Sequence, residues 1–218
     1  MSAREEALQA IQDGGIVAIV RLDSADQLVA TAEAIEAGGI RAIEFTMTTP
    51  GAIEMLREAA KKLSSQAVLG AGTVLDSETA RQVILAGAKF VVAPTLNFNT
   101  IAMAHRYSVA VFPGAFTPTE VLSAWEAGAD LVKLFPASVG GPELVKAILA
   151  PLPHIKILPT GGVNLETAAA FIKAGSTALA VGGNLVDKKA IQRGDFGSII
   201  DIARQYVEIV RQARAEKK

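Results

Sequence analysis

Eight short apolar segments alternate with helix-like segments along this chain, and that alternation limits the folds it can adopt. The predicted strands are residues 16–21, 42–46, 68–73, 90–94, 110–114, 131–135, 156–160 and 178–182. Strands joined by helices through short connections form parallel sheets. Eight of them favour closure into a (β/α)8 TIM barrel, with an open doubly wound sheet as the alternative.

An Ala-Gly pair closes every second helix-like segment. The glycines of these pairs, separated by 49, 41 and 47 residues, are Gly38, Gly87, Gly128 and Gly175. Each spacing is about the length of two βα units, as expected of a regular array. We expect each glycine to end its helix in the left-handed conformation, which glycine adopts without steric cost.

Several predicted helices begin with residues that favour helix N-termini. The starts that match N-cap or capping-box chemistry are Ser24 with Gln27, Thr117 with Glu120, and Asn164. The first fifteen residues predict a short amphipathic helix and not a signal peptide, because they contain three acids and no apolar core. The last helix is expected over residues 199–215.

Length and composition indicate one domain, residues 1–218, and exclude several kinds of partner. Half of the residues are hydrophobic, which is enough for a large core, and the net charge of -1 predicts no binding to nucleic acid or to a membrane surface. No apolar run approaches the roughly 18 residues that span a bilayer. The chain has no cysteine, which excludes disulfides, thiolate metal sites and a cysteine nucleophile. We expect a cytoplasmic protein.

Two predicted strands carry a charge in mid-strand, where burial makes charge costly. They are Glu44 in AIEFT and Lys133 in DLVKLFPA. Burial of an amine favours its neutral form, so Lys133 is expected to attack carbonyl carbons and form a Schiff base. A buried ion pair with a purely structural role is the alternative.

Polar residues and glycines follow the predicted strands, at the end where barrel enzymes have their active sites. These strand-end positions are Arg21, Thr46, Thr73, Pro94, Gly114, Thr160, Gly161, Gly162, Gly182, Gly183 and Asn184. Glycine pairs directly after the last two strands can expose backbone N–H groups to an anion such as phosphate. Tight turns are the other reason for such pairs.

No metal site is expected from the sequence. His105 lies in a helix-like segment and His154 in a loop, so neither belongs to a cluster of metal ligands. The chemistry predicted for Lys133 requires no metal and no organic cofactor.

The motifs AIEFTMTTP, GAGTVLD, VVAPTLN, VFPGAFTPTE, LVKLFPAS and LPTGGVN resemble, in order and spacing, those of the class I 2-keto-3-deoxy-6-phosphogluconate (KDPG) and 4-hydroxy-2-oxoglutarate (KHG) aldolases. The resemblance covers residues 15 to 186. It implies a homotrimeric barrel in which Lys133, on the sixth strand, forms a Schiff base with a 2-oxo acid.

The same resemblance assigns roles to further residues. Glu44 matches the general acid–base, Thr73 lines the pyruvate end, and Pro94 and Phe135 form apolar walls near the Schiff base. The positions that match the phosphate site are Thr160, Gly161, Gly162, Gly182 and Gly183. Arg21 is a further candidate anion ligand.

Two positions depart from the pattern of the family. Thr48 stands where many members have an arginine that grips the substrate carboxylate, and Asn184 stands where a serine is common near the phosphate. The first difference affects carboxylate binding and substrate preference.

The resemblance therefore implies a carbon–carbon lyase that cleaves 2-dehydro-3-deoxy-6-phosphogluconate to pyruvate and glyceraldehyde 3-phosphate, and 4-hydroxy-2-oxoglutarate to pyruvate and glyoxylate. One alternative is an aldolase for 2-dehydro-3-deoxy-6-phosphogalactonate. Others are a phosphosugar isomerase or epimerase, and a barrel that binds a phosphorylated metabolite without catalysis. The isomerase requires paired acids, a cysteine or a metal site, which the sequence does not offer.

Overall fold

The computed structural model describes residues 2–22, 27–64 and 66–216. Its strands are β1 (Ile16–Val20), β2 (Ala42–Thr46), β3 (Val68–Gly72), β4 (Phe90–Val92), β5 (Ala110–Phe112), β6 (Gly114–Ala115), β7 (Val132–Leu134), β8 (Ile157–Pro159) and β9 (Leu179–Val181). The strand orders are β5-β4-β3-β2-β1-β9 and β6-β7-β8, all parallel. A bridge between Thr160 and Ala180 joins the two sheets on one side. The predicted α/β barrel is confirmed.

The fifth predicted strand, residues 110–114, is divided in the structure. β5 pairs with β4 and β6 pairs with β7, and Pro113 lies between them. Proline has no N–H to donate to a neighbouring strand. Its carbonyl still accepts a hydrogen bond from the Lys133 N–H at 2.9 Å, so the two short strands together occupy one position in the barrel.

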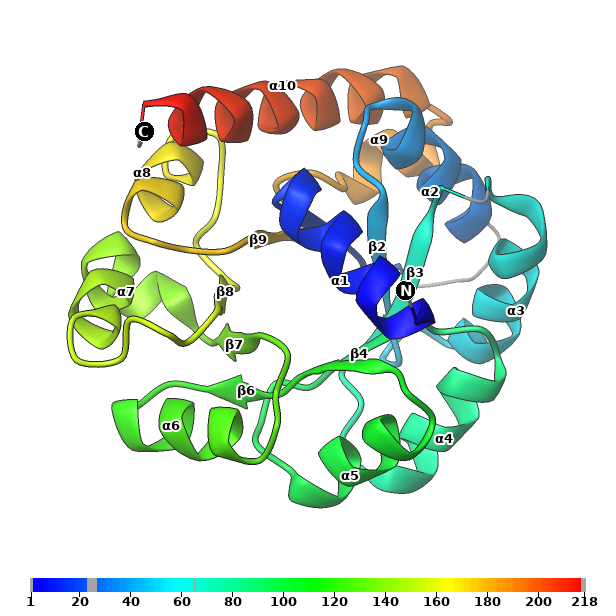
Figure 1. The fold of residues 1–218 in the computed structure, drawn as a ribbon. Helices are drawn as coiled ribbons and strands as arrows, with labels where there is room; N and C mark the ends of the chain where they lie inside the picture. The colour runs from blue at the N-terminus through cyan, green and yellow to red at the C-terminus, as the bar shows by residue number, and fades with distance from the viewer. Residues whose placement is uncertain (1, 23–26, 65, 217–218) are drawn as a thin grey trace.

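Helices surround the strands (Figure 1). They are α1 (Ala3–Gly14), α2 (Leu28–Ala37), α3 (Ala52–Lys62), α4 (Ser77–Leu85), α5 (Phe98–Arg106), α6 (Pro118–Glu126), α7 (Gly141–Leu149), α8 (Ala168–Lys173), α9 (Lys188–Gln192) and α10 (Phe196–Ala215). A 3₁₀ turn, η1 (Ala137–Val139), follows β7. α10 packs against α2 and α8 on the outside of the barrel.

The predicted helix starts are confirmed in part. Thr117 and Glu120 form the expected capping box of α6. Asn164 accepts hydrogen bonds from the N–H groups of Glu166 and Thr167, but these close a turn and α8 begins only at Ala168. α10 begins three residues before the predicted start because Asp195 caps it. The predicted cap at Ser24 lies outside the described residues.

Three of the four glycines predicted to end helices are left-handed. The φ angles of Gly87, Gly128 and Gly175 are 112°, 96° and 112°. The prediction for Gly38 is wrong, because its φ is -79° and the left-handed residue is Gly39, with φ 95°. Gly38 and Gly39 are adjacent, and the sequence does not show which of the two takes the left-handed conformation.

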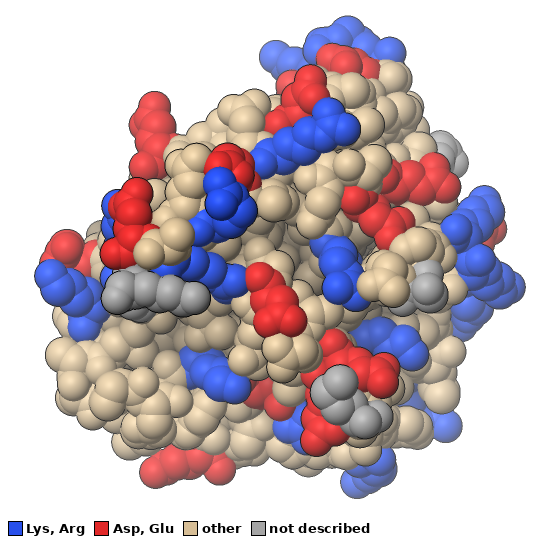
Figure 2. All heavy atoms as spheres, turned by 45° about the horizontal axis from the view of Figure 1, so that its top comes forward, with Lys and Arg blue, Asp and Glu red and all other residues tan. Residues whose placement is uncertain are grey.

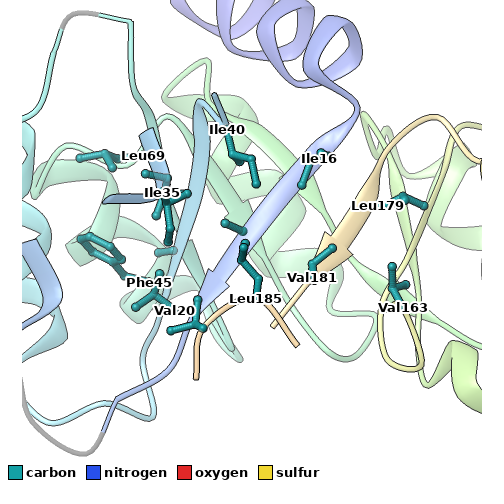
Figure 3. Packing of buried hydrophobic residues seen from close by; sticks show 14 of the residues in the cluster. Ile16, Val20, Ile35, Ile40, Phe45, Leu69, Val163, Leu179, Val181 and Leu185 are labelled. Carbon is teal, nitrogen blue, oxygen red and sulfur yellow. The ribbon is translucent and has the colours of Figure 1, made fainter. Parts of the chain in front are cut away.

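Successive side chains of each strand point alternately outward and inward, and this divides the core into two regions. Side chains that face outward pack against the helices, as Figure 3 shows for Ile16, Val20, Phe45, Leu179 and Val181. Side chains that face inward fill the barrel together with α1, whose Ala7, Ala10 and Ile11 belong to the same cluster. In Figure 1 α1 lies across the end of the barrel that faces the viewer. The N-terminal end of the barrel is therefore closed by α1.

On the face that carries α10, acidic and basic side chains are interspersed and form no continuous basic stripe (Figure 2). Within the part of the chain that the structure describes, no helix is long and apolar enough to span a bilayer.

Candidate active site

Strand alternation directs Glu44 and Lys133 into the barrel. On β2, Phe45 belongs to the outer core, so its neighbour Glu44 points inward. On β7, Val132 and Leu134 face the helices, and Lys133 between them points inward. The exposed fractions are 1% for Glu44 and 5% for Lys133. Both mid-strand charges singled out in the sequence are thus buried.

Within the described part of the chain, one oxygen of the Glu44 carboxylate is without a hydrogen bond. Its Oε2 atom is buried and has no hydrogen-bond partner among the described residues. Desolvation by burial raises the pKa of Glu44, and the positive charges of Lys133 and Arg21 oppose this increase only in part. A buried carboxyl with a raised pKa can take up and release protons near neutral pH, as a general acid–base must.

The Lys133 side chain ends beside an aromatic ring. Its Nζ lies 5.4 Å from the centroid of the Phe135 ring. β6 and β8 flank it, with Gly114 and Leu158 at the paired positions, so one neighbour presents no side chain. No ion pair within 4.0 Å joins Lys133 to Glu44. The alternative of a buried structural ion pair is therefore not supported.

A cavity of about 630 Å³ opens at the carboxyl ends of β1, β8 and β9. It brings together eight of the residues predicted from the sequence, which are Arg21, Phe135, Thr160, Gly161, Gly162, Gly182, Gly183 and Asn184. The cavity therefore reaches from the ring beside Lys133 to both glycine turns.

The two glycine turns that line this cavity contain N–H groups without a hydrogen-bond partner among the described residues. The N–H groups of Gly161, Gly162 and Gly183 donate no hydrogen bond to any described residue. Gly161 and Gly162 have φ angles of 89° and 75°, and a Cβ on Gly162 would lie 2.8 Å from Cα of Ser138. The Asn184 amide donates to the Val163 carbonyl at 2.8 Å and so ties the two turns together. Adjacent free N–H groups of this kind suit an anion.

Hydroxyl groups gather where β2 ends. The Thr48 hydroxyl donates to Oγ1 of Thr46 at 3.1 Å, and Thr49 accepts from the Leu22 N–H at 3.2 Å. Thr46 is buried, whereas Thr48 is exposed. These hydroxyls occupy the side of the barrel mouth next to Glu44, and neither Thr46 nor Thr48 lines the 630 Å³ cavity.

Thr73 and Pro94 also lie outside that cavity. Thr73 has a left-handed φ of 58°, a strained conformation for a β-branched residue, and lines a neighbouring cavity of about 420 Å³ with Thr49 and Pro50. Pro94 is packed so closely that a Cβ on Gly114 would overlap its carbonyl group. Strained residues that the surrounding structure holds in place are common at functional sites.

Sequence reasoning missed several residues of the cavity. They are Ile19, Val163, Ala180, Val186, Asp187, Lys188 and Lys189. The apolar residues among them occupy ordinary strand and loop positions, and nothing in the sequence distinguishes them from core residues. The two consecutive lysines that begin five residues after Gly183 were a signal that could have been used, since cations suit an anion site.

Side chains suited to binding a metal are not grouped in this structure. Residues 2–22, 27–64 and 66–216 contain no cluster of three or more His, Cys, Asp or Glu residues that could hold a metal ion.

Comparisons with known proteins agree on one kind of relative. The model of the aldolase family described as KDPG and KHG aldolase matches residues 8–202. The 2-dehydro-3-deoxy-phosphogluconate aldolase of Treponema pallidum is 35% identical over 207 residues, which are 94% of this chain and 96% of the relative.

Two solved structures extend this comparison to three dimensions. A native KDPGal structure gives a TM-score of 0.85 at 30% identity and covers 92% of this chain and 96% of the other. The KDPG aldolase of Legionella pneumophila, with pyruvate captured as a covalent carbinolamine intermediate, gives 0.84 at 25% identity and covers 91% and 96%.

Proposed function

Because the chain belongs to the KDPG and KHG aldolase family, we propose that it is a class I aldolase that cleaves 2-dehydro-3-deoxy-6-phosphogluconate to pyruvate and glyceraldehyde 3-phosphate. The observation that carries this proposal is the pair of buried groups, Glu44 and Lys133, that face one barrel interior beside a cavity lined by two glycine turns. A buried amine and a buried acid without an ion pair between them are suited to covalent chemistry on a ketone.

In the proposed reaction the Lys133 amine attacks the C2 carbonyl of the substrate. The carbinolamine loses water and becomes a protonated imine, which withdraws electrons from C3. Glu44 then takes the proton of the C4 hydroxyl, the C3–C4 bond breaks, and its electron pair forms an enamine while the aldehyde leaves. Protonation of the enamine at C3 and addition of water to the imine release pyruvate and restore the amine.

The cavity supports one orientation of the substrate. The phosphate lies on the N–H groups of Gly161, Gly162 and Gly183, where Arg21 adds a positive charge. The carboxylate lies outside this cavity, on the other side of the barrel mouth, near Thr73 and the hydroxyl groups of Thr46 and Thr48. Hydroxyl donors on this side take the place of an arginine at position 48.

Trapping tests the nucleophile directly. Borohydride reduction in the presence of pyruvate should add one reduced pyruvyl group to the wild-type protein, and Lys133→Ala should abolish the adduct. Lys156→Ala, at another barrel lysine that lies outside this site, serves as the control and should keep it. An adduct that persists in Lys133→Ala would rule out the proposed nucleophile.

Two related substrates compete with the first. The matched family includes enzymes for 4-hydroxy-2-oxoglutarate, and one of the similar structures is of a KDPGal enzyme. All three substrates are 2-oxo acids with a hydroxyl at C4, so the chemistry of Lys133 and Glu44 serves each of them. A coupled assay for pyruvate, run on the gluconate, galactonate and oxoglutarate substrates in parallel, separates them by kcat/KM.

We also propose that the enzyme is a homotrimer, as the family resemblance implies. Leu75, Leu85 and Phe98 expose between 51% and 59% of their surface along α4 and α5, and Tyr107 is 36% exposed beside them. The Asn97 side-chain amide donates a hydrogen bond to the Leu75 carbonyl at 3.0 Å, so the segment that holds Leu75 lies beside the start of α5, where Phe98 is. α4 packs against α5, so these exposed apolar side chains lie on neighbouring elements, and such side chains favour contact with a second copy.

A cytoplasmic location accompanies this proposal. Its substrate carries a carboxylate and a phosphate, and such an anion does not cross a bilayer unaided. The enzyme therefore has to work where its substrate is formed.

A further inference from the structure

Beyond Val68, the third strand contributes no side chain to the inside of the barrel. In VLGAG, Leu69 and Ala71 face outward with the outer core, so Gly70 and Gly72 are the inward-facing positions near the active site. The register places Gly70 beside Glu44 and Gly72 beside Thr46. Side chains from the neighbouring strands therefore fill the space beside these two glycines.

Backbone conformation does not require glycine at either position. Neither Gly70 nor Gly72 has a φ angle in the left-handed region, where glycine has an advantage over other residues. A glycine inside a strand commonly marks a place where another group approaches closely. The identity of that group distinguishes one glycine of this strand from the other.

Space is the requirement at both positions. A Cβ on Gly70 would overlap the ring of Phe90, which stacks on Phe112 in the barrel core. A Cβ on Gly72 would overlap Oε1 and Cδ of Glu44 and lie 2.7 Å from its Cγ. Gly70 thus makes room for a core side chain, and Gly72 makes room for the carboxylate itself.

We infer that Gly72 is a positioning residue for the reaction, because the space left by its missing side chain determines where the Glu44 carboxylate lies. No hydrogen bond holds Oε2 of this carboxylate among the described residues, so steric contact has a large share in its placement. A methyl group at position 72 would push the carboxylate away from its present place. This inference rests on the proposed role of Glu44 as general acid–base.

The test is a double-mutant cycle on Glu44→Ala and Gly72→Ala. Loss of a general acid–base lowers kcat by roughly 10²- to 10⁴-fold, and Gly72→Ala should lower it by about 10²-fold because its effect passes through Glu44. The double variant should have the kcat of Glu44→Ala alone, within about threefold. Multiplied losses would show that Gly72 acts independently of Glu44 and would overturn the inference.

Two matched controls sharpen the cycle. Gly70→Ala overlaps Phe90 and not Glu44, so its effect should multiply with that of Glu44→Ala. Gly14→Ala meets no atom within 4 Å and should leave kcat and Tm unchanged. Gly72→Ala should still form the reduced pyruvyl adduct, because Lys133 is untouched. Loss of that adduct in the folded variant would count against a role confined to Glu44.

Thermal unfolding gives a readout that needs no activity. Gly72→Ala should lower Tm in the wild-type background and should not lower it in the Glu44→Ala background, where the overlap is gone. If Gly72→Ala alone fails to fold, a folded double variant supports the inference and an unfolded one overturns it. If wild type releases no pyruvate, the proposed function fails, and the Tm cycle still decides whether residues 44 and 72 share this space.

Discussion

Glu44 and Lys133 face the same barrel interior from β2 and β7 without forming an ion pair within 4.0 Å. Both are buried, and the positive charges of Lys133 and Arg21 offset the cost of burying the Glu44 carboxylate only in part. The burial of Glu44 therefore costs stability. An amine and an acid that are not paired with each other are both available to a substrate, which is the arrangement that the proposed chemistry needs.

Glu44→Gln should raise the stability of the fold at neutral pH. Burial raises the pKa of Glu44 above its ordinary value of 4.5, so above that pH the folded protein retains a proton that the unfolded chain has released. The stability due to this group therefore falls as the pH rises from 4.5 toward the raised pKa. The advantage of Gln in the free energy of unfolding should be smallest near pH 4 and grow upward from there.

Urea unfolding of both proteins between pH 4 and pH 8 measures this difference. Glu54→Gln, at an exposed glutamate of α3, controls for the loss of one carboxylate. A stability difference between Glu44→Gln and wild type that stays constant or shrinks with rising pH contradicts the prediction. In the same variant kcat should fall by roughly 10²- to 10⁴-fold.

Gly162→Ala should impair the phosphate end of the site selectively. Its φ of 75° is unfavourable for alanine, and the added Cβ would press on Ser138, so the free N–H groups of the turn would move. We expect kcat/KM for phosphorylated substrates to drop about tenfold or more, and that for 4-hydroxy-2-oxoglutarate to change little.

Gly194→Ala is the matched control for that experiment. Gly194 has φ 71°, close to the value at Gly162, but a Cβ there would meet no atom within 4 Å. Its backbone strain should lower Tm without changing the ratio between the substrates. Equal losses for phosphorylated and unphosphorylated substrates in Gly162→Ala would mean that the turn does not hold the phosphate.

Phe98→Glu should weaken the proposed trimer. This side chain is 59% exposed beside Leu75, so a charge there would be buried against a neighbouring copy at a cost of several kcal/mol. Light scattering after size-exclusion chromatography should show a smaller species than wild type. Val139→Glu, at an apolar residue of η1 that is 71% exposed, should leave the assembly intact. A wild-type protein that elutes as a monomer would refute the trimer.

Arg214→Leu should destabilise the barrel without changing kcat. The guanidinium donates hydrogen bonds to the carbonyl groups of Gln12, Asp13 and Thr177 at 2.7 to 2.9 Å, and it thereby joins α10 to the end of α1 and to the segment before β9. Removing these charged donors should cost about 2 to 4 kcal/mol in the free energy of unfolding. Arg211→Ala, at an exposed arginine three residues earlier, should have little effect in the same urea titration.

Much of the fold could be predicted because buried parallel strands are continuous apolar runs bounded by glycine and polar residues. Glu44 and Lys133 stood out for the same reason, since a charge in such a run is rare. The division at Pro113 and the choice between Gly38 and Gly39 depend on local hydrogen bonds and backbone angles that the apolar pattern does not encode.

The site was harder to predict where a role depends on a residue from another strand. Gly72 resembles any strand glycine until Glu44 is seen to occupy the space beside it. Thr73 directly follows the same strand, but it has a left-handed backbone and lines a second cavity. Lys189 lines the main cavity from the short helix α9, and the strand pattern of the sequence does not predict this helix.

Because α1 closes the N-terminal end of the barrel, substrate and products can reach and leave Lys133 only through the opposite end. The glycine turns lie at that mouth, with Gly162 and Gly183 exposed, whereas the Lys133 side chain lies below them. In the proposed reaction both products leave through this mouth, and the phosphorylated aldehyde departs first because pyruvate is still bound to Lys133. In the reverse direction pyruvate must therefore enter before the aldehyde.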